Sequence, residues 1–415
     1  MSLEKKLVNV HELNKVTTGI WRSRCLTDQS VNLLDVRREV EELYKAVKLY
    51  GFDNIETVHF DECMYPYMRV GKDISEDIRV LSAFGVMNLL LMSDSAVSVD
   101  RLQVHYGDVL LKELFESRSG MPFKLTDDSL VDAMERYTGA SLNRNSYEPI
   151  YIQQLYNFVM RKTKRVDLLE LWSQTEALYK GIVTLGLENV RVWFYENHSE
   201  RKEMFGSQLL AEVRAFCGLI VMFMYGVRID STHVLHIRNM LGLRYSIHDY
   251  LGYNYLAGCK TLQQIVSLYV EAPAGTIEAK PLFIQKPFEL IEMKKFDFEN
   301  LRNIELLWTA LDSLYRNVKM VGLPNVSVSY FDEIKKQKVV LTGTEIPERV
   351  RAFCEECVIY MYRMSDDSVK RAQLEEIFCL DNPSSYLLGD TNVISCKKSM
   401  PCVSLKEIAK RYMES

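Results

Sequence analysis

The chain carries nearly the same stretch of sequence three times, about 135 residues apart. The copies run from Val36 to Glu62, from Leu171 to Asn197 and from Leu307 to Glu333. They align without a gap, and the matching landmarks include Leu43-Tyr44, Leu178-Tyr179 and Leu314-Tyr315, and then Gly51, Gly186 and Gly322. A long fixed period with matching landmarks is typical of a repeat architecture. Repetition favours an extended surface for partners over a single catalytic cleft.

Each copy begins with a predicted helix. In the first copy the apolar residues alternate three- and four-residue steps and so share one helical face: Leu33, Val36, Val40, Leu43, Val47 and Tyr50. The glycine that follows is placed where a helix end needs a residue that tolerates positive φ. A short strand comes next, with Val190, Val192 and Phe194 on one side in the second copy, and the run from Lys335 to Gly343 predicts a hairpin return in the third.

A second long helix is predicted from a shared pair of residues, Ile78-Arg79, Val213-Arg214 and Val350-Arg351. Its many large apolar residues indicate a central core helix. Each copy then closes on a helix in which Ser129, Thr261 or Ser404 stands three residues before Asp132, Gln264 or Glu407. This spacing predicts a capping box at the helix start.

The predicted fold class is therefore α+β and dominated by helix, in three tandem repeats of helix, strand, strand, helix, short helices and a capped final helix. The predicted boundaries are an N-terminal extension at 1–29, repeats at 30–142, 165–271 and 298–415, and linkers at 143–164 and 272–297. The second linker contains Pro273, Gly275, Pro281 and Pro287, which break regular structure.

Composition narrows the class of protein. The 415 residues are 47% hydrophobic and 26% charged, which is typical of a folded chain. The net charge of −5 has the wrong sign for a general phosphate-binding surface. No apolar run reaches membrane-spanning length, and the N-terminus lacks the apolar core of a secretory signal. Nine scattered cysteines favour free thiols, so we expect an intracellular protein, cytoplasmic or nuclear, without a membrane partner.

The second half of the middle copy has a distinctive order of segments. A helix ends at Gly226, and Val227 to Gly242, Ile247 to Asn254 and a capped helix from Thr261 follow. The first copy has a similar order in residues 96–114 and 121–137, and the third copy compresses the middle segment to 365–380. This order of helix, short β-like segment, helix, small turn and final helix in the second half of each copy resembles the LOTUS (OST-HTH) winged-helix domains. In that family a Gly-Phe or Gly-Tyr step precedes the last helix, and Gly252-Tyr253 matches it. The resemblance implies binding of a DEAD-box helicase or of RNA; the front half of each repeat has no place in the family pattern.

Three groups of residues have side chains that can bind a metal, but each has a simpler interpretation. Cys354 and Cys357, with Cys396 and Cys402 downstream, have the composition of a four-thiolate zinc site. Alignment of Cys354 with Cys217 instead favours buried core cysteines. His233, His236 and His248 cluster without partners at metal-ligand spacing, so surface or capping roles are favoured. The strand-end acids Asp61-Glu62, Glu196 and Asp332-Glu333 predict turn roles more than magnesium binding.

No phosphate-binding glycine loop or common hydrolase or dinucleotide motif is found, so we predict neither catalytic residues nor a cofactor. Tyr44, Tyr179 and Tyr315 recur on the first helix as a candidate partner-binding stripe, with packing at the edge of a core as the alternative. Arg161, Lys162, Lys164 and Arg165 form a basic cluster that is either a nucleic-acid contact or a solvated linker.

The leading hypothesis is a non-enzymatic interaction protein, a scaffold that binds a protein or ribonucleoprotein partner on a three-repeat surface. Direct binding of RNA or DNA through the winged-helix-like segments is the alternative, and an enzyme of unrecognised class is the third.

Overall fold

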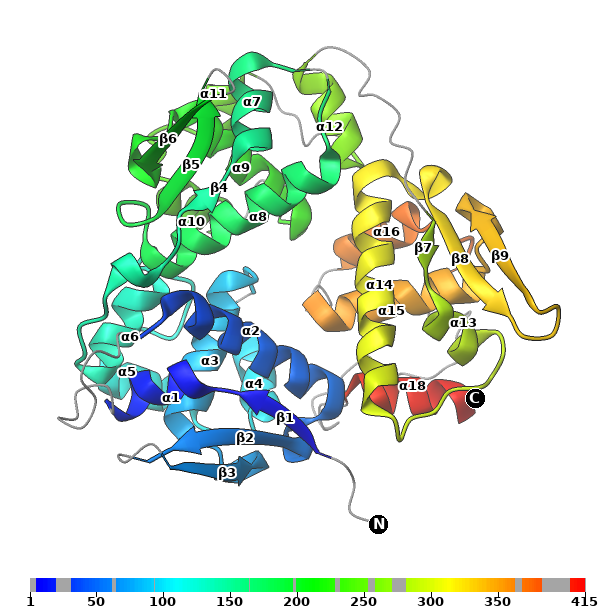
Figure 1. The fold of residues 1–415 in the computed structure, drawn as a ribbon, viewed down its shortest axis with the longest axis horizontal. Helices are drawn as coiled ribbons and strands as arrows, with labels where there is room; N and C mark the ends of the chain where they lie inside the picture. The colour runs from blue at the N-terminus through cyan, green and yellow to red at the C-terminus, as the bar shows by residue number, and fades with distance from the viewer. Residues whose placement is uncertain are drawn as a thin grey trace. The chain divides into compact units, whose positions relative to one another are not determined.

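The computed structural model describes residues 5–19, 31–61, 65–92, 94–163, 165–196, 199–227, 232–252, 258–270, 281–362, 368–382 and 404–414. The chain divides into two compact units. The first unit contains residues 5–47 and 51–256, and the second contains residues 48–50 and 257–415. Figure 1 shows the helices and strands of both units.

The first unit contains two small sheets and their helices. Around the first sheet the elements are β1 (Lys6–Asn9), α1 (His11–Thr18), α2 (Leu33–Tyr50), β2 (Ile55–Phe60), β3 (Pro66–Val70), α3 (Glu76–Leu89), α4 (Ala96–His105), α5 (Leu111–Ser119) and α6 (Leu130–Thr138). Around the second sheet they are β4 (Ile150–Tyr151), α7 (Gln153–Arg161), α8 (Leu168–Leu185), β5 (Arg191–Glu196), β6 (Glu200–Phe205), α9 (Ala211–Met224), α10 (Thr232–Met240) and α11 (Ile247–Leu251).

The second unit contains the third sheet. Its elements are α12 (Leu262–Tyr269), β7 (Leu282–Phe283), α13 (Gln285–Ile291), α14 (Leu301–Val321), β8 (Ser327–Asp332), β9 (Gln337–Thr342), α15 (Glu348–Tyr362), α16 (Ser368–Ile377) and α18 (Leu405–Glu414).

All three sheets have the same strand order and the same strand directions. The central strand, β2, β5 or β8, pairs antiparallel with the strand after it and parallel with a strand that precedes the long helix. The predicted α+β class dominated by helix is confirmed. Three sheets of identical topology are consistent with three repeats.

The strand and helix at the start of each sheet were not predicted. β1 and α1 lie in the stretch expected to be an N-terminal extension, and β4–α7 and β7–α13 lie in the stretches expected to be linkers. β4 and β7 are only two residues long, too short for a periodic pattern. The three stretches share an apolar residue between strand and helix, Val10, Ile152 or Ile284, each fully buried. These stretches therefore belong to the sheets that they were expected to separate.

In the first two segments, a side chain of the long helix caps the N-terminus of the short helix, and the capping residue differs between them. Glu39 of α2 accepts hydrogen bonds from the backbone N–H groups of Glu12 and Leu13. Gln174 of α8 accepts the equivalent bonds from Gln154 and Leu155. In the third segment the gapless alignment places Ala310 at that position, and α13 carries Pro287 in its first turn. Because proline has no N–H, one of the two donors is missing there.

The predicted helix ends agree with the structure. Gly51, Gly186 and Gly322 follow α2, α8 and α14 with φ of 80°, 83° and 82° and ψ near 150°, a region open essentially to glycine alone. The capping boxes at Ser129 and Thr261 are formed, and Ser404 and Glu407 exchange the same pair of hydrogen bonds.

The arginine shared by the central helices has the same contacts in all three segments. Arg79 of α3 donates to the carbonyls of Tyr106 and Gly107, and Arg214 of α9 donates to those of Leu241 and Gly242. Arg351 of α15 donates to Phe378 and Cys379. In each case the acceptors lie 27 and 28 residues downstream, where the next helix ends. A buried guanidinium thus satisfies carbonyls that a helix end leaves without intrahelical partners.

The central helices are largely buried, as expected, and α9 exposes little of its apolar sequence. Within the part of the chain that the structure describes, no helix has both the length and the apolar character to cross a membrane.

Candidate functional site

The three recurrent tyrosines are core residues. Tyr44, Tyr179 and Tyr315 are 3%, 0% and 2% exposed. The hydroxyl of Tyr179 donates to the carbonyl of Asn88 at 3.2 Å, and burial raises the pKa of Tyr179 well above its usual value. A ring without exposed surface cannot stack on a partner, so the predicted binding stripe is replaced by the packing role that the sequence left open.

The basic cluster lies at the end of α7. Arg161 is its last residue, and Lys162 follows in a left-handed conformation with φ of 45°. Arg161, Lys162 and Arg165 are exposed, and Lys164 lies outside the described residues. The cluster therefore offers side chains to solvent but belongs to no cavity described here.

The cysteines at metal-ligand spacing pack inside the central helices. Cys354 and Cys357 are fully buried, and the thiol of Cys354 donates to the carbonyl of Leu311 at 3.5 Å. The thiol of Cys217 makes the equivalent contact with Thr175 at 3.7 Å. Burial raises the pKa of all three thiols. Cys396 and Cys402 lie outside the described residues, and within those residues no group of three or more metal-ligating side chains is found.

The histidine cluster is not brought together as one site. His236 is buried, with Nδ1 3.2 Å from Asp127, and Asn239 donates to the same carboxylate at 2.9 Å. Burial lowers the pKa of His236. His233 lies on the same helix, α10, and His248 lies on α11. The contact with Asp127 joins α10 to the loop before α6, which is a structural role.

Two of the strand-end acids, Asp61 and Asp332, have turn roles, and two others, Glu196 and Glu333, form ion pairs. Asp61 accepts from the backbone N–H of Tyr65 at 2.9 Å, and Asp332 accepts from those of Ile334 and Lys335. The hydrogen bond from Lys335 lowers the pKa of Asp332. Glu196 pairs with Lys202 across its hairpin at 3.2 Å. Glu62 lies outside the described residues, and Glu333 pairs with Lys295 at 3.7 Å.

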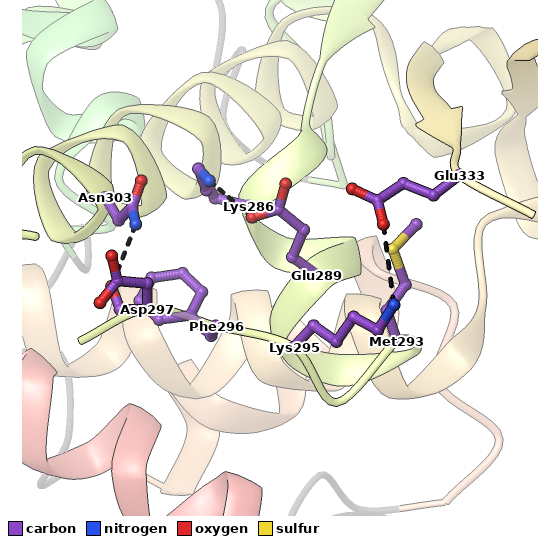
Figure 2. Close-up of a pocket in the computed structure, with 8 residues that line it drawn as sticks. All are labelled: Lys286, Glu289, Met293, Lys295, Phe296, Asp297, Asn303 and Glu333. Carbon is purple, nitrogen blue, oxygen red and sulfur yellow. Dashed lines mark hydrogen bonds and ion pairs between the residues drawn. The ribbon is translucent and has the colours of Figure 1, made fainter. Parts of the chain in front are cut away.

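A cavity of about 410 Å³ opens in the second unit beside α13. Figure 2 shows its lining of Lys286, Glu289, Met293, Lys295, Phe296, Asp297, Asn303 and Glu333. Lys286 pairs with Glu289 at 2.5 Å, and Asn303 donates to the backbone carbonyl of Asp297 at 3.0 Å. Lys295 pairs with Glu333, and the carboxylate of Asp297 accepts the backbone N–H groups of Glu299 and Asn300, so these charged side chains are engaged within the protein.

The outer face of the second sheet is aromatic. Because side chains alternate along a strand, Val192 and Phe194 of β5 point into the core while Trp193 and Tyr195 point away from it. The ring of Trp193 lies 4.5 Å from that of Tyr151 and 5.6 Å from that of Tyr195. Tyr195 and Phe205 are 39% and 45% exposed. We call Tyr151, Trp193, Tyr195, Phe205 and their charged neighbours Arg191, Arg201 and Glu203 the aromatic face.

The charged residues of the aromatic face share one carboxylate. Arg191 and Arg201 each lie 3.3 Å from an oxygen of Glu203. Arg191 also donates to the backbone carbonyls of Tyr147 and Asn145. The guanidinium carbon of Arg201 lies 4.5 Å from the centroid of the Trp193 ring, a cation–π geometry.

The other two sheets also expose apolar side chains on this side. Phe60 and Phe331 occupy the position of Tyr195 in the gapless alignment. Leu7 and Met68 are exposed on the first sheet, and Phe283, Phe331 and Val340 are exposed on the third. The positions of Trp193 and Arg201 hold Val58 and Pro66 in the first sheet and Ser329 and Lys338 in the third. The combination of tryptophan and arginine is therefore specific to the second of the three.

Two of the edge strands, β6 and β3, are poor templates for another strand. β6 opens with Glu200, Arg201, Lys202 and Glu203, and β3 opens with Pro66. Charged side chains and proline on an edge disfavour the addition of a further strand. A partner is therefore better accommodated on a face than on an edge.

The aromatic face was not predicted from the sequence. Val190, Val192 and Phe194 predicted the strand, and no role was predicted for the residues between them. A strand with one solvated face normally carries polar side chains there, so Trp193 and Tyr195 at those positions were the available signal. Tyr151 and Arg201 join them only through the strand register.

The winged-helix resemblance stays a prediction. After α9 the described elements are the helices α10, α11 and α12, and α10 lies within the stretch Val227 to Gly242. Residues 228–231 and Tyr253 lie outside the described residues. Gly252 ends α11 with φ of 74°. Comparisons of the chain with protein-family models, curated proteins and solved structures find no match.

Proposed function

We propose that this protein is a non-enzymatic binding protein that docks partner proteins, alone or within a ribonucleoprotein, on the outer faces of its sheets. The observation that carries the proposal is the aromatic face. Tryptophan, tyrosine and arginine are the residue types in which the binding energy of protein interfaces concentrates. Covering exposed apolar surface contributes roughly 25 cal/mol per Å², so the partly exposed rings favour a covering partner.

The three faces have related construction but different chemistry, which supports a scaffold role. The first offers aliphatic side chains such as Leu7 and Met68, and the third offers Phe283 and Phe331. Faces of different composition select different partners or different parts of one partner.

The test is quantitative affinity purification of the full chain and of a Trp193→Ala/Tyr195→Ala double variant. Hot-spot residues cost 2 kcal/mol or more when truncated, so we expect recovery of partners to fall by at least about thirtyfold. Leu235→Ala is the matched control, because Leu235 is an exposed apolar residue of α10 outside the aromatic face. The proposal fails if the double variant, folded as shown by circular dichroism, recovers the same partners as the parent protein.

Direct nucleic-acid binding is a second candidate because Arg161, Lys162 and Arg165 are exposed together at the end of α7. Neutralising these residues and Lys164 would then weaken binding of single-stranded RNA across sequences. It would also reduce the salt dependence by about one unit of slope for each phosphate contact removed. An unchanged salt slope in this variant contradicts that function.

A further inference from the structure

We propose that the aromatic face binds an acidic and apolar peptide segment of a partner protein, with a carboxylate of the partner on Arg201, a neighbouring apolar side chain on Tyr195 and a second apolar side chain further along the segment on Phe205. This inference rests on the proposed function and names the chemistry of the partner.

Arg201 is oriented for a carboxylate before a partner arrives. Its planar guanidinium lies over Trp193, and its side chain is 53% exposed. Its ion pair with Glu203 uses Nη2 at 3.3 Å, whereas a guanidinium has five N–H donors. The guanidinium therefore keeps further donors in the fork that matches a carboxylate in two-point contact.

The charges on this face of β5 and β6 favour an acidic partner at the Arg201 end. Arg191 and Arg201 share Glu203, which leaves one positive charge in excess on this face of the two strands. The carboxylate of Glu170 acts on Tyr151 of β4, on the other side of β5 from Arg201. Arg191 is anchored by two backbone carbonyls as well, so Arg201 is the guanidinium that can turn toward a ligand. Complementary charge of this kind gives specificity and speeds association.

The apolar part of the site is adjacent. In the strand register, Tyr195 of β5 lies opposite Arg201 of β6. Phe205 lies on the same face of β6, two residues after Glu203. Both rings are substantially exposed. In an extended segment, alternate side chains point the same way, so a carboxylate on Arg201 can be followed by apolar side chains two and four residues away, and the one four residues away reaches Phe205.

The same charges disfavour a nucleic acid on this face. A phosphate backbone requires a row of cations, each neutralising one phosphate. Glu203 lies among the two arginines, and Lys202 of the same strand points to the opposite face and pairs with Glu196. A peptide carboxylate needs only Arg201.

The probes are four ligands of matched length: a fluorescent twelve-residue peptide alternating Glu with Leu or Phe, its Gln-for-Glu and Lys-for-Glu versions, and oligouridylate. Fluorescence anisotropy with the full chain should show the acidic peptide binding at least tenfold more tightly than the Gln version. Trp193→Ala and Arg201→Glu should each weaken the acidic peptide by at least tenfold. Arg201→Glu should also shift preference to the Lys version. Lys202→Ala is the matched control and should change nothing.

The outcomes separate the two proposals. Equal binding of the acidic and Gln peptides, with both still dependent on Trp193, overturns the charge inference and leaves the protein-docking function standing. Preference for oligouridylate at this face overturns the inference in favour of nucleic acid. Failure of all peptides to bind, together with an unchanged partner set in the Trp193→Ala/Tyr195→Ala variant, overturns both. Arg201→Lys keeps the positive charge and removes the planar guanidinium. If this variant loses the preference for the acidic peptide, recognition depends on the two-point geometry of the arginine and not on its charge alone.

Discussion

At the scale of single residues, Glu39 connects two helices through one buried carboxylate. Its oxygens accept from Glu12 at 3.1 Å and Leu13 at 2.8 Å, and only 3% of the residue is exposed. Burial raises the pKa of Glu39 to about 7, although the two backbone N–H groups oppose the shift. Gln174 makes the equivalent contacts in the next segment with a neutral amide.

Glu39→Gln should therefore make the protein less sensitive to pH. The folded-state pKa lies above the unfolded value, so this carboxyl contributes its full stability below about pH 4.5 and loses it as pH rises through about 7. At pH 8 we expect the variant to be more stable than the parent protein by roughly 1–3 kcal/mol, and at pH 4.5 about equally stable. Urea unfolding at the two pH values measures this difference, and a gap that does not change with pH contradicts it.

At the scale of elements, the shared arginine binds each central helix to the end of the following one. Arg79 is buried, donates to Tyr106 at 3.1 Å and to Gly107 at 3.4 Å, and has its pKa lowered by burial. Helices α3 and α4 are thereby joined where α4 exposes carbonyls that lack intrahelical partners.

Arg79→Met should loosen the end of α4 while keeping most of the side-chain volume. Loss of hydrogen bonds from a charged donor to buried carbonyls costs about 1.5–3 kcal/mol. We expect the free energy of unfolding to fall by that amount, and amide exchange to speed up over the last turn of α4. Arg38→Met is the control, because Arg38 is exposed and pairs with Asp35 three residues away on the same helix. Equal effects of the two substitutions refute the assigned role.

At the scale of the molecule, the first unit joins two sheets through helix contacts. The closing helix α6 packs against α8, and the hydroxyl of Tyr179 on α8 reaches the carbonyl of Asn88 in α3. Lys180 of α8 also pairs with Glu41 of α2 at 2.7 Å. In the second unit the corresponding closing helix, α12, packs against α14.

Tyr179→Phe should consequently affect both halves of the first unit. It removes one buried hydrogen bond, at a cost of about 1 kcal/mol, and leaves the carbonyl of Asn88 without this donor. We expect amide exchange to increase in α3 and in α8 by the same factor, because the two helices open together. An increase confined to α8 shows that the two halves open separately.

The sequence alone determined the features that depend on interactions between nearby residues. The long helices, the glycines at their ends, the main hairpins and the capping boxes all depend on residues within a few positions of one another. Alignment of the copies gave each pattern three times, so α2, α8 and α14 were predicted together with their following strands. The α+β class followed from those elements.

Only the tertiary structure decided the rest. β4 has two residues, too few for a periodic pattern, and it becomes a strand because it pairs with β5 some forty residues later. The buried state of Tyr179 and the contact of Arg79 depend on helices that meet in space. Trp193, Tyr151 and Arg201 come from three strands, and they form one surface because the pairing register places them on the same side of the sheet. The register depends on how distant segments pair, so it cannot be predicted from the composition of a single strand.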